Sequence, residues 1–426
     1  RTSRPAMGES GADVTETRRD TGPGPAGPGG AAGTGRPMVM LVMATLGFAL
    51  NFWAWALLSP LAPRIQESLG LTSFEQSLLV AVPVIVGSLG RIPVGALTDR
   101  FGGRVMFPAL SLITIAPVLY IGLLGRSSLA SLLVGGFFLG VAGTVFAVGV
   151  PFVSAWFPPE RRGLALGVFG AGMGGTAITA LTTIPLVDAR GIAFPFALMA
   201  VVLAVYAVAA WLVLREAPGR TMPDAPLGRR LAATLRLPVT WQMSALYAVV
   251  FGGFVAFSVY LPTYLKEQYD LSQADASSRM AGFVVLAVAM RPFGGWLSDR
   301  LGGVRVMVAS LLVTMVCAAV QSTAPPLMPL GTIAFLTMAA ALGAGTGATF
   351  ALVAQLAPAG KVGAVTGVVG AAGGLGGFVP PLVMGGIYGA FGSYALGLVL
   401  LALVAAAAAV FTATAVRRAA SSRRDG

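Results

Sequence analysis

Two arginines 200 residues apart, Arg91 and Arg291, stand inside apolar stretches long enough to cross a bilayer. Each opens the same pattern, RIPVGALTDRFGG at 91–103 and RPFGGWLSDRLGG at 291–303, and seven of the thirteen positions are identical. An arginine near the centre of a membrane helix costs about 3 kcal/mol on insertion scales. Two of them at equivalent places in two repeated halves therefore indicate a functional role. We interpret them as part of an anion pathway between the halves.

Composition places the chain in the membrane. Hydrophobic residues make up 56% of the 426 residues, charged residues only 10%, and the mean hydropathy is +0.83. A soluble protein of this length needs a far more charged surface. The net charge of +12 does not indicate nucleic acid, because the arginines stand singly or in pairs between apolar runs, as topology determinants do. We expect the lipid bilayer as a partner and no nucleic acid.

The residue types that most often carry catalysis are missing. The sequence has no histidine and one cysteine, Cys317, which lies within an apolar run. A disulfide framework or a histidine-based metal or catalytic site therefore cannot form. No metal-ligand cluster, catalytic triad or pair of carboxylates occurs either, so we expect no enzyme, no metal and no cofactor.

Hydropathy predicts an all-α membrane protein with twelve transmembrane helices in two pseudo-symmetric six-helix bundles. The expected spans are 38–60, 76–98, 105–125, 129–156, 163–187, 192–214, 240–264, 279–298, 304–323, 327–356, 362–388 and 392–416. The bundles then occupy 38–214 and 240–416. A linker at 215–239, with a short surface helix near Leu227–Leu235, separates them, and a disordered tail at 1–37 and a second tail at 417–426 flank them.

The distribution of basic residues predicts the orientation. Of the 28 Lys and Arg residues, 21 fall in the tails, the linker and the loops on their side, five fall on the other side, and Arg91 and Arg291 remain. By the positive-inside rule, both termini and the linker face the cytoplasm, in the cytoplasmic membrane. Substrate is then expected near the midplane between the bundles, and we expect a monomer.

A second repeat has the same offset of 200. GLALGVFGAGMGG at 163–175 matches GAVTGVVGAAGGL at 363–375 at six positions. Glycines spaced by three and four residues give a helix a smooth face, which can serve close packing alone. Alternatively, these faces line a narrow substrate route and slide during alternating access. Because the segments are membrane spans with no preceding strand, a nucleotide-binding interpretation is not supported.

The end of each arginine repeat predicts a gate. Asp99 and Asp299 lie at helix ends and are followed by Arg100 and Arg300 and by a pair of glycines that suits a tight turn. An aspartate there can pair with an arginine or a helix N-terminus in one conformation and lose that partner in the other. We therefore expect these four residues to act in gating.

The pattern G-x-x-x-D-R-x-G-G after the second and eighth spans, on a six-plus-six scaffold, resembles the major facilitator superfamily over residues 38 to about 416. The arginine ahead of that pattern in both halves and the segments GAGMGGTAITALTTIP and GAAGGLGGFVPP resemble the nitrate/nitrite porter family. This resemblance implies a major facilitator fold and nitrate or nitrite as substrate. It also implies that the substrate-binding residues are Arg91, Arg291, Tyr247, Phe146, Phe251, Met173, Gly174 and Gly374, with the two phenylalanine rings on the faces of the planar anion.

One position departs from the family pattern. The family commonly has asparagine near Met173, and the loss of an amide donor leaves one face of the anion without its hydrogen bond. Thr176 or Asn51 could take over this role.

The chemistry of the arginines agrees with the resemblance. The forked donors of a guanidinium fit the oxygens of a small planar anion better than an ammonium does. At a separation of about 4 Å and an effective dielectric of about 20, one such attraction is about 4 kcal/mol before desolvation. A carrier for another small anion, such as a short carboxylate, remains an alternative. A receptor that does not transport is disfavoured, because no soluble signalling domain is present.

Energy coupling is predicted from an absence of titratable groups. Proton symport usually requires a carboxylate or histidine inside the membrane. This chain has no histidine, and its acidic residues fall in loops, tails or helix ends. We therefore expect exchange of nitrate for nitrite, with proton-coupled nitrate symport as the alternative.

Overall fold

The structure, a computed structural model, describes residues 35–218, 227–358 and 362–422. By their contacts, Arg1–Arg36 and Pro37–Gly426 form two separate units, and the helical array belongs to the second. The tail expected at 1–37 lies almost wholly outside the described residues, as does 219–226 of the linker. The described chain is helical and contains no strand, which confirms the predicted all-α class.

The N half (residues 37–218) contains ten α-helices and two short 3₁₀ segments. They are α1 Gly35–Trp55, α2 Leu58–Leu69, α3 Ser73–Leu89, α4 Arg91–Phe101, α5 Gly103–Leu123, α6 Leu129–Leu139, η1 Gly140–Thr144, α7 Val145–Trp156, α8 Pro159–Gly170, η2 Ala171–Gly174, α9 Gly175–Arg190 and α10 Phe194–Val213. The short helix predicted in the linker is present with the expected bounds, α11 Leu227–Leu235.

The C half (residues 238–422) has longer helices. They are α12 Pro238–Tyr269, α13 Gln273–Leu301, α14 Gly303–Ser322, η3 Leu327–Gly331, α15 Thr332–Leu356, α16 Val362–Gly376, α17 Val379–Phe391, α18 Ala395–Phe411, η4 Thr412–Val416 and α19 Arg417–Ser422. The predicted tail at 417–426 is therefore helical as far as Ser422, and its last four residues lie outside the described chain. The division at 214 and 240 stays a prediction, because the chain from Pro37 onward forms one compact unit.

Within the described residues, eleven helical spans are long and apolar enough to cross a membrane, and α3 with α4 makes a twelfth when the bent pair counts as one. Several spans are longer than predicted. The first was expected to end at residue 60, but α2 continues to Leu69. The physical reason is burial, since Leu61 and Ile65 pack into the core of the N half and keep that side of the helix apolar.

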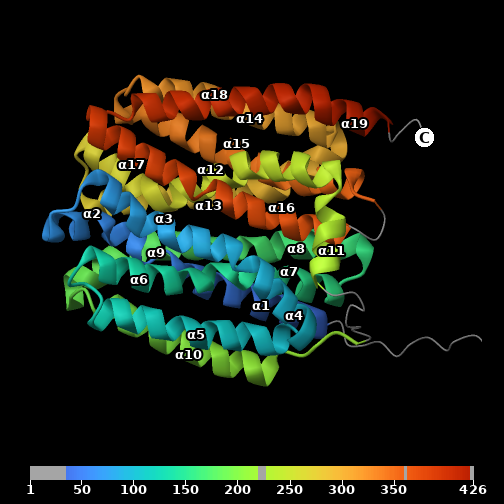
Figure 1. Cartoon of the computed structure of the whole chain (residues 1–426), viewed down its shortest axis with the longest axis horizontal. Coiled ribbons are helices and arrows are strands. Elements are labelled where there is room, and N and C mark those ends of the chain that lie inside the picture. The colour runs from blue at the N-terminus through green and yellow to red at the C-terminus, as the bar shows by residue number, and fades with distance from the viewer. Residues whose placement is uncertain (1–34, 219–226, 359–361, 423–426) are drawn as a thin grey trace, which may run out of the picture. The chain divides into compact units, whose positions relative to one another are not determined.

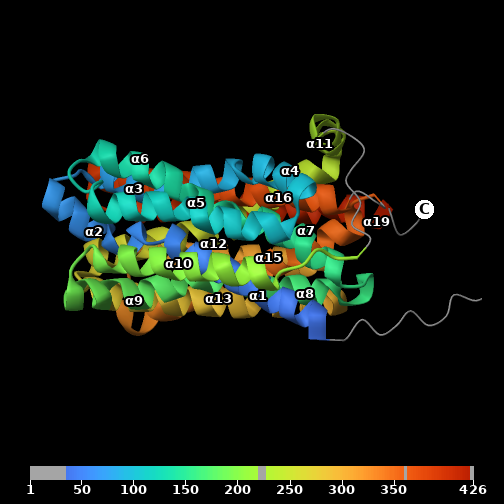
Figure 2. The same cartoon turned by 90° about the horizontal axis from the view of Figure 1, so that it is seen from below.

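Two ends of the helical array can be recognised in Figures 1 and 2. The linker end has α11, the start of α1 and the turn between α4 and α5. The far end has α2 and the end of α12. These two helices are neighbours there, because Lys266 of α12 pairs with Glu67 of α2. Both predicted G-x-x-x-D-R-x-G-G turns begin at positive-φ glycines, Gly102 and Gly302, whose φ angles of 81° and 92° favour glycine over other residues.

The two halves meet along equivalent pairs of helices. Helix α9 of the N half packs along α13 of the C half, and α3 of the N half packs along α17 of the C half. The offset of 200 relates these two contacts to each other. Hydrogen bonds reinforce the contact at the far end, where Gln76 Nε2 donates to Thr263 Oγ1 at 3.1 Å, Lys266 pairs with Glu67, and Gln273 donates to the carbonyl of Pro60.

Helix irregularities collect around the arginine of the N half. The axis bends by 41° between α3 and α4, at the residue directly before Arg91. The neighbouring spans change to 3₁₀ geometry in η1 and η2. In the C half, α12, α13 and α15 continue without a break through the corresponding region. Such breaks in membrane helices are tolerated where the freed backbone groups find partners inside the protein, and they often mark functional sites.

Close backbone contact fixes α13 against α15. A side chain at Gly294 would begin 2.2 Å from the carbonyl oxygen of Ala344, and one at Gly347 would begin 2.1 Å from the carbonyl oxygen of Arg291. Atoms do not approach so closely, so both positions require glycine. The next residue, Gly295, faces open space, since a Cβ atom placed there would have no heavy atom within 4 Å.

These neighbours define a matched pair of variants. We expect Gly294→Ala to lower stability by about 1–3 kcal/mol, because the added methyl group forces α13 away from α15. Gly295→Ala should leave stability unchanged within about 0.5 kcal/mol. Thermal unfolding of the purified proteins in detergent measures both. Equal melting temperatures for the two variants would contradict the close approach of α13 and α15.

Candidate anion-binding site

The two arginines converge on one aromatic ring. Arg91 is the first residue of α4, Arg291 lies within α13, and Phe251 lies in α12. The Cζ atoms of Arg91 and Arg291 are 5.9 Å and 5.7 Å from the centre of the Phe251 ring. Arg91 is 8% exposed and Phe251 is 2% exposed. The tertiary structure thus brings residues separated by 200 positions into one buried site, as the repeat predicts.

Each guanidinium reaches across to the glycine segment of the other half. Arg91 Nη1 donates to the carbonyl oxygen of Gly370 in α16 at 2.6 Å, and its Nε contacts the carbonyl oxygen of Gly143 in η1 at 3.4 Å. Arg291 Nη1 contacts the sulfur of Met173 in η2. These crossed contacts link the halves at the level of the site.

The acceptors around the arginines are neutral. They are two backbone carbonyls, the Met173 thioether and the Tyr247 hydroxyl, which Arg291 Nη2 contacts at 3.3 Å. Neither arginine forms an ion pair with a carboxylate anywhere in the described chain. Two positive charges, on the buried Arg91 and the partly buried Arg291, are thus left without a carboxylate partner in the described chain. An anion is the chemical species that would supply the counter-charge.

Aromatic rings form the walls of the site. The rings of Tyr247 and Phe251 are stacked with centres 4.7 Å apart and planes 3° apart. The ring of Phe146 lies 5.3 Å from the Arg91 Cζ atom and packs against Phe48 and Phe169 in the N half. Guanidiniums over aromatic faces gain about 0.5–2 kcal/mol each. The predicted contact of both rings with the anion itself stays a prediction.

The glycine repeat contains two kinds of position. Some glycines make room for the arginines: a side chain at Gly374 would begin 3.2 Å from Arg91 Nη1 and 2.3 Å from Ser88 Oγ. One at Gly170 would begin 3.6 Å from Arg291 Nη1. Gly174, by contrast, faces open space, and a side chain there would begin with no heavy atom within 4 Å. The structure thus places Gly374 beside an arginine and Gly174 apart from both.

Met173 replaces the expected amide with a sulfur atom. Its thioether is a weak acceptor and contacts Arg291, so it does not provide a donor for an anion. Neither proposed substitute faces the arginines. Asn51 donates to the carbonyl of Gly47 and to Ser111, at 2.8 Å and 2.9 Å, and the Thr176 hydroxyl donates to the Met173 carbonyl. Both are engaged within the N half.

The four predicted gating residues lie at the linker end. Arg100 stacks over the ring of Phe101 at 5.3 Å, and Arg300 stacks over Trp296 at 4.3 Å. Within the described chain, Asp299 forms no ion pair, while Asp99 is in contact with another group. The proposed exchange of aspartate partners stays a prediction.

Sequence reasoning missed three groups beside the arginines. Gly370 belongs to the glycine repeat, so the repeat could have identified it. The carbonyl of Gly143 has no signal in the sequence, because a backbone acceptor in η1 is recognised only from its contact with Arg91. Ser88 precedes Arg91 by three residues, and its hydroxyl donates to the Val84 carbonyl in its own helix.

Comparison with known proteins identifies the relatives of this chain. The family model of the Major Facilitator Superfamily matches residues 44–278 and 264–425. The chain is 50% identical to the probable nitrate/nitrite transporter NarK2 of Mycobacterium tuberculosis, over 88% of this chain and 96% of the relative. It is 36% identical to the nitrite extrusion protein of Bacillus subtilis, over 88% and 93%. It is 34% identical to the probable nitrate/nitrite antiporter NarK1 of Thermus thermophilus, over 70% and 68%.

Solved structures show the same fold. Two structures of a bacterial homologue of the human lysosomal transporter Spinster superpose with TM-scores of 0.71 and 0.67. They cover 90% of this chain and 97–98% of the other, at 18% and 20% sequence identity.

The uncompensated charges predict stabilisation by anions. At fixed ionic strength, small monovalent inorganic anions should raise the melting temperature of the purified protein. At a hundredfold excess over the dissociation constant, the free energy of unfolding should rise by about 2.7 kcal/mol. Arg91→Lys and Arg291→Lys keep the charge but lose the forked donors, so each should lose most of this stabilisation. Arg190→Lys, an exposed residue at the far end, is the control. A full anion response in either site variant would assign that arginine a structural role.

Proposed function

We propose that this chain, which belongs to the major facilitator superfamily and within it to the nitrate/nitrite porter family, carries nitrate, nitrite or both across the cytoplasmic membrane by alternating access. The observation that carries this proposal is the pair of guanidiniums, Arg91 and Arg291, that face Phe251 from the two halves with neutral acceptors only. The names of the relatives agree with it.

The site suits a small, flat and weakly hydrated anion. Forked N–H donors match oxygens that lie in one plane, and flat rings fit against a planar ion without displacing the arginines. Gly370 lies against Phe146 and Gly374 lies against Ser88 and Arg91, so the surroundings of Arg91 are closely packed and a compact ligand is favoured. A dicarboxylate would need further donors, and Met173 stands where a donor is missing. The geometry therefore favours nitrate and nitrite over carboxylates.

Transport requires that the anion contact both halves and that the halves then move. Both arginines already bridge the halves, since Arg91 contacts Gly370 and Arg291 contacts Met173. An anion between them would replace these contacts with stronger charge-assisted ones and would draw the halves together around itself. The far-end contacts, such as Gln76 with Thr263, would open in the alternate state.

The proposed orientation places the linker end in the cytoplasm. The basic residues support this, with 21 on the side of the tails and linker and five on the other. Asp99, Arg100, Asp299 and Arg300 would then act as the cytoplasmic gate. One chain contains a complete site with an arginine from each half, which supports a monomer as the transporting unit.

The carboxylates support exchange as the coupling mode. In the described chain they lie at helix ends or in loops. Glu267, two residues before the end of α12, is hydrogen-bonded to Tyr394 and lies sixteen residues beyond Phe251, which is about 24 Å along the helix. A proton at Glu267 would therefore act on the anion only over a long distance. A counter-anion, in contrast, acts directly on the charges of Arg91 and Arg291.

Exchange predicts that uptake depends on an internal anion. Isotopically labelled nitrate should enter proteoliposomes loaded with nitrite at least ten times faster than proteoliposomes loaded with gluconate, because the bound anion supplies the counter-charge that closure of the site requires. Initial uptake rates measure this. Uphill uptake driven only by a pH gradient, without a counter-anion, would establish proton symport and leave the site assignment standing. Absence of nitrate flux under every loading would reject the proposed substrate.

The aromatic walls give a graded prediction. Phe251 faces both guanidiniums and Phe146 faces one, so Phe251→Leu should raise the half-saturation concentration for nitrate more than Phe146→Leu does. We expect about 5- to 30-fold for Phe251, the range that the loss of two cation–π contacts of about 0.5–1 kcal/mol each implies. Leucine keeps apolar bulk, and Phe196→Leu, in the buried core of the N half, controls for core damage. Unchanged affinity at normal melting temperature would show that the rings only pack the bundle.

A further inference from the structure

The C half has a second feature that anion transport does not use. A cavity of about 130 Å³ lies at the far end between α12, α13 and α15. Its walls are apolar, with Leu261, Phe283, Phe335 and Leu336 among them, and its rim has one charged side chain, Arg279. Gly282 on this wall faces open space, since a Cβ atom placed there would have no heavy atom within 4 Å. This cavity is separate from the site around Phe251.

Comparison of the two halves shows that this cavity is found in the C half and that the equivalent region of the N half is packed with side chains. At the equivalent positions of the N half, Leu79 and Leu132 are 1% and 0% exposed and pack with Leu61 and Ile65 into a closed apolar cluster. In the C half, the same two positions are Arg279 and Thr332, and both line the cavity. The C half thus has two polar residues and a cavity at positions where the N half has two buried leucines.

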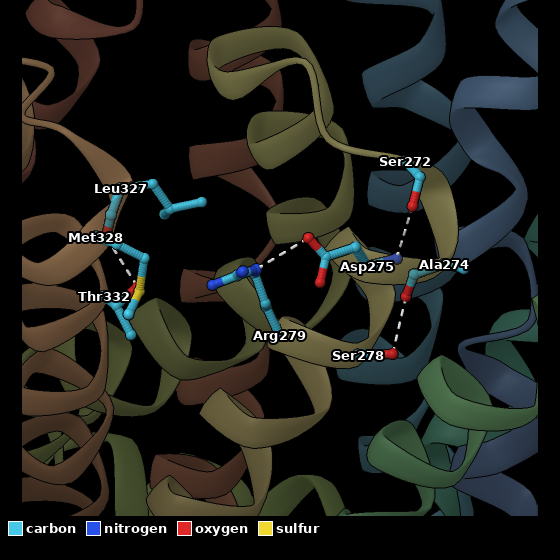
Figure 3. Close-up of polar contacts among 8 residues, drawn as sticks. All are labelled: Ser272, Ala274, Asp275, Ser278, Arg279, Leu327, Met328 and Thr332. Carbon is cyan, nitrogen blue, oxygen red and sulfur yellow. Dashed lines mark hydrogen bonds and ion pairs between the residues drawn. The ribbon is translucent and has the colours of Figure 1, made fainter.

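Arg279 has donors to spare. Its Nε atom pairs with Asp275 Oδ2 at 3.3 Å, one turn earlier in α13. In Figure 3 the outer nitrogens point away from Asp275, toward Leu327, Met328 and Thr332. No described residue accepts a hydrogen bond from these outer nitrogens. A guanidinium with a free fork is a phosphate ligand when a phosphate lies in reach.

The depth of the cavity matches the structure of a bilayer. At 1.5 Å per residue, the 29 residues of α13 span about 43 Å, so about 7 Å at each end projects beyond a hydrocarbon core of about 30 Å. Arg279 lies six residues into α13, about 9 Å from its start, and Thr332 lies five residues into the span that begins at Leu327. Both therefore lie near the boundary of headgroups and hydrocarbon.

The apolar part of the cavity extends deeper and opens sideways. Phe283, Phe335 and Leu336 follow the polar pair toward the middle of the membrane. Leu336, which lines the cavity, is 38% exposed, and Val285 of α13 and Ile333 of α15 are 56% and 57% exposed. A ligand with its charge at Arg279 and its apolar part below would thus face lipid, and would not face the route between the halves.

We propose that this cavity binds one phospholipid, with its phosphate on the outer nitrogens of Arg279 and the first part of an acyl chain against Phe283 and Phe335. An anionic headgroup is favoured, because its net negative charge complements Arg279, the one charged side chain that lines the cavity. The lipid fills in the C half the space that Leu79 and Leu132 fill in the N half. Binding of this lipid requires that the chain cross a membrane and is independent of which anion the carrier transports.

Native mass spectrometry of the full chain, released from detergent after incubation with phosphatidylglycerol, tests the proposal. We expect one retained phosphatidylglycerol in the wild-type protein. Arg279→Leu, which installs the residue of the N half, and Gly282→Leu, which fills the cavity without touching the charge, should each lower its retention at least tenfold. Arg126→Leu, in the loop between α5 and α6 of the N half at the same end, should retain it fully. The melting temperature of each variant shows that it is folded.

Two comparator ligands distinguish binding of a phospholipid from binding of an apolar chain alone or of a free phosphate. Diacylglycerol with identical chains lacks the phosphate and should be retained at least tenfold less. Inorganic phosphate lacks the chains and should not displace the lipid. Equal retention by wild type and Arg279→Leu would overturn the proposal, as would equal retention of diacylglycerol. Displacement by inorganic phosphate alone would assign the cavity to a free anion and would also overturn it.

Discussion

Two guanidinium groups without a counter-charge in the described chain, Arg91 buried and Arg291 partly buried, dominate the organisation of this protein. Arg91 and Arg291 donate to carbonyl, thioether and hydroxyl groups that carry no negative charge. An arginine in this environment is costly, and its hydrogen bonds compensate for lost hydration only in part. The surrounding helices accordingly adopt a geometry that a simple bundle does not need. Gly370 and Gly374 permit close approach, the carbonyl of Gly143 contacts Arg91 from the 3₁₀ segment η1, and the helix axis bends directly before Arg91.

The same charges explain why the halves must act together. Each arginine belongs to one half and contacts the glycine segment of the other, so neither half contains a complete site. The contacts between α9 and α13 and between α3 and α17 are related by the repeat, and the two glycine segments are adjacent to them. Binding or release of an anion between the arginines would therefore act on both of these helix contacts. This symmetry gives a simple physical route from binding to movement of the halves.

Departures from the repeat are as informative as the repeat itself. The positions equivalent to Tyr247 and Phe251 are Gly47 and Asn51, so the stacked aromatic pair exists in the C half only. At the far end, Arg279 and Thr332 replace two buried leucines and leave a cavity. Asymmetry of this kind cannot be required by the fold, because the other half folds without it. It identifies the positions at which each half has acquired its own chemistry.

The sequence by itself determined the class of protein, the order of the spans, and the pairing of Arg91 with Arg291 across the repeat, and its twelve spans match the structure when the bent pair α3 and α4 counts as one. These follow from hydrophobic length and from a repeat in register, both of which are local or one-dimensional properties. It also identified Tyr247, Phe146 and Phe251, although only by resemblance. Contacts that depend on three dimensions were beyond it. Nothing in one sequence shows that Arg91 reaches the carbonyl of Gly370, that Gly174 faces open space while Gly374 faces an arginine, or that Asn51 is engaged elsewhere. The bend at Gly90 and the cavity at Arg279 were likewise decided by packing, because a helix break or an unfilled space depends on which side chains meet from distant segments.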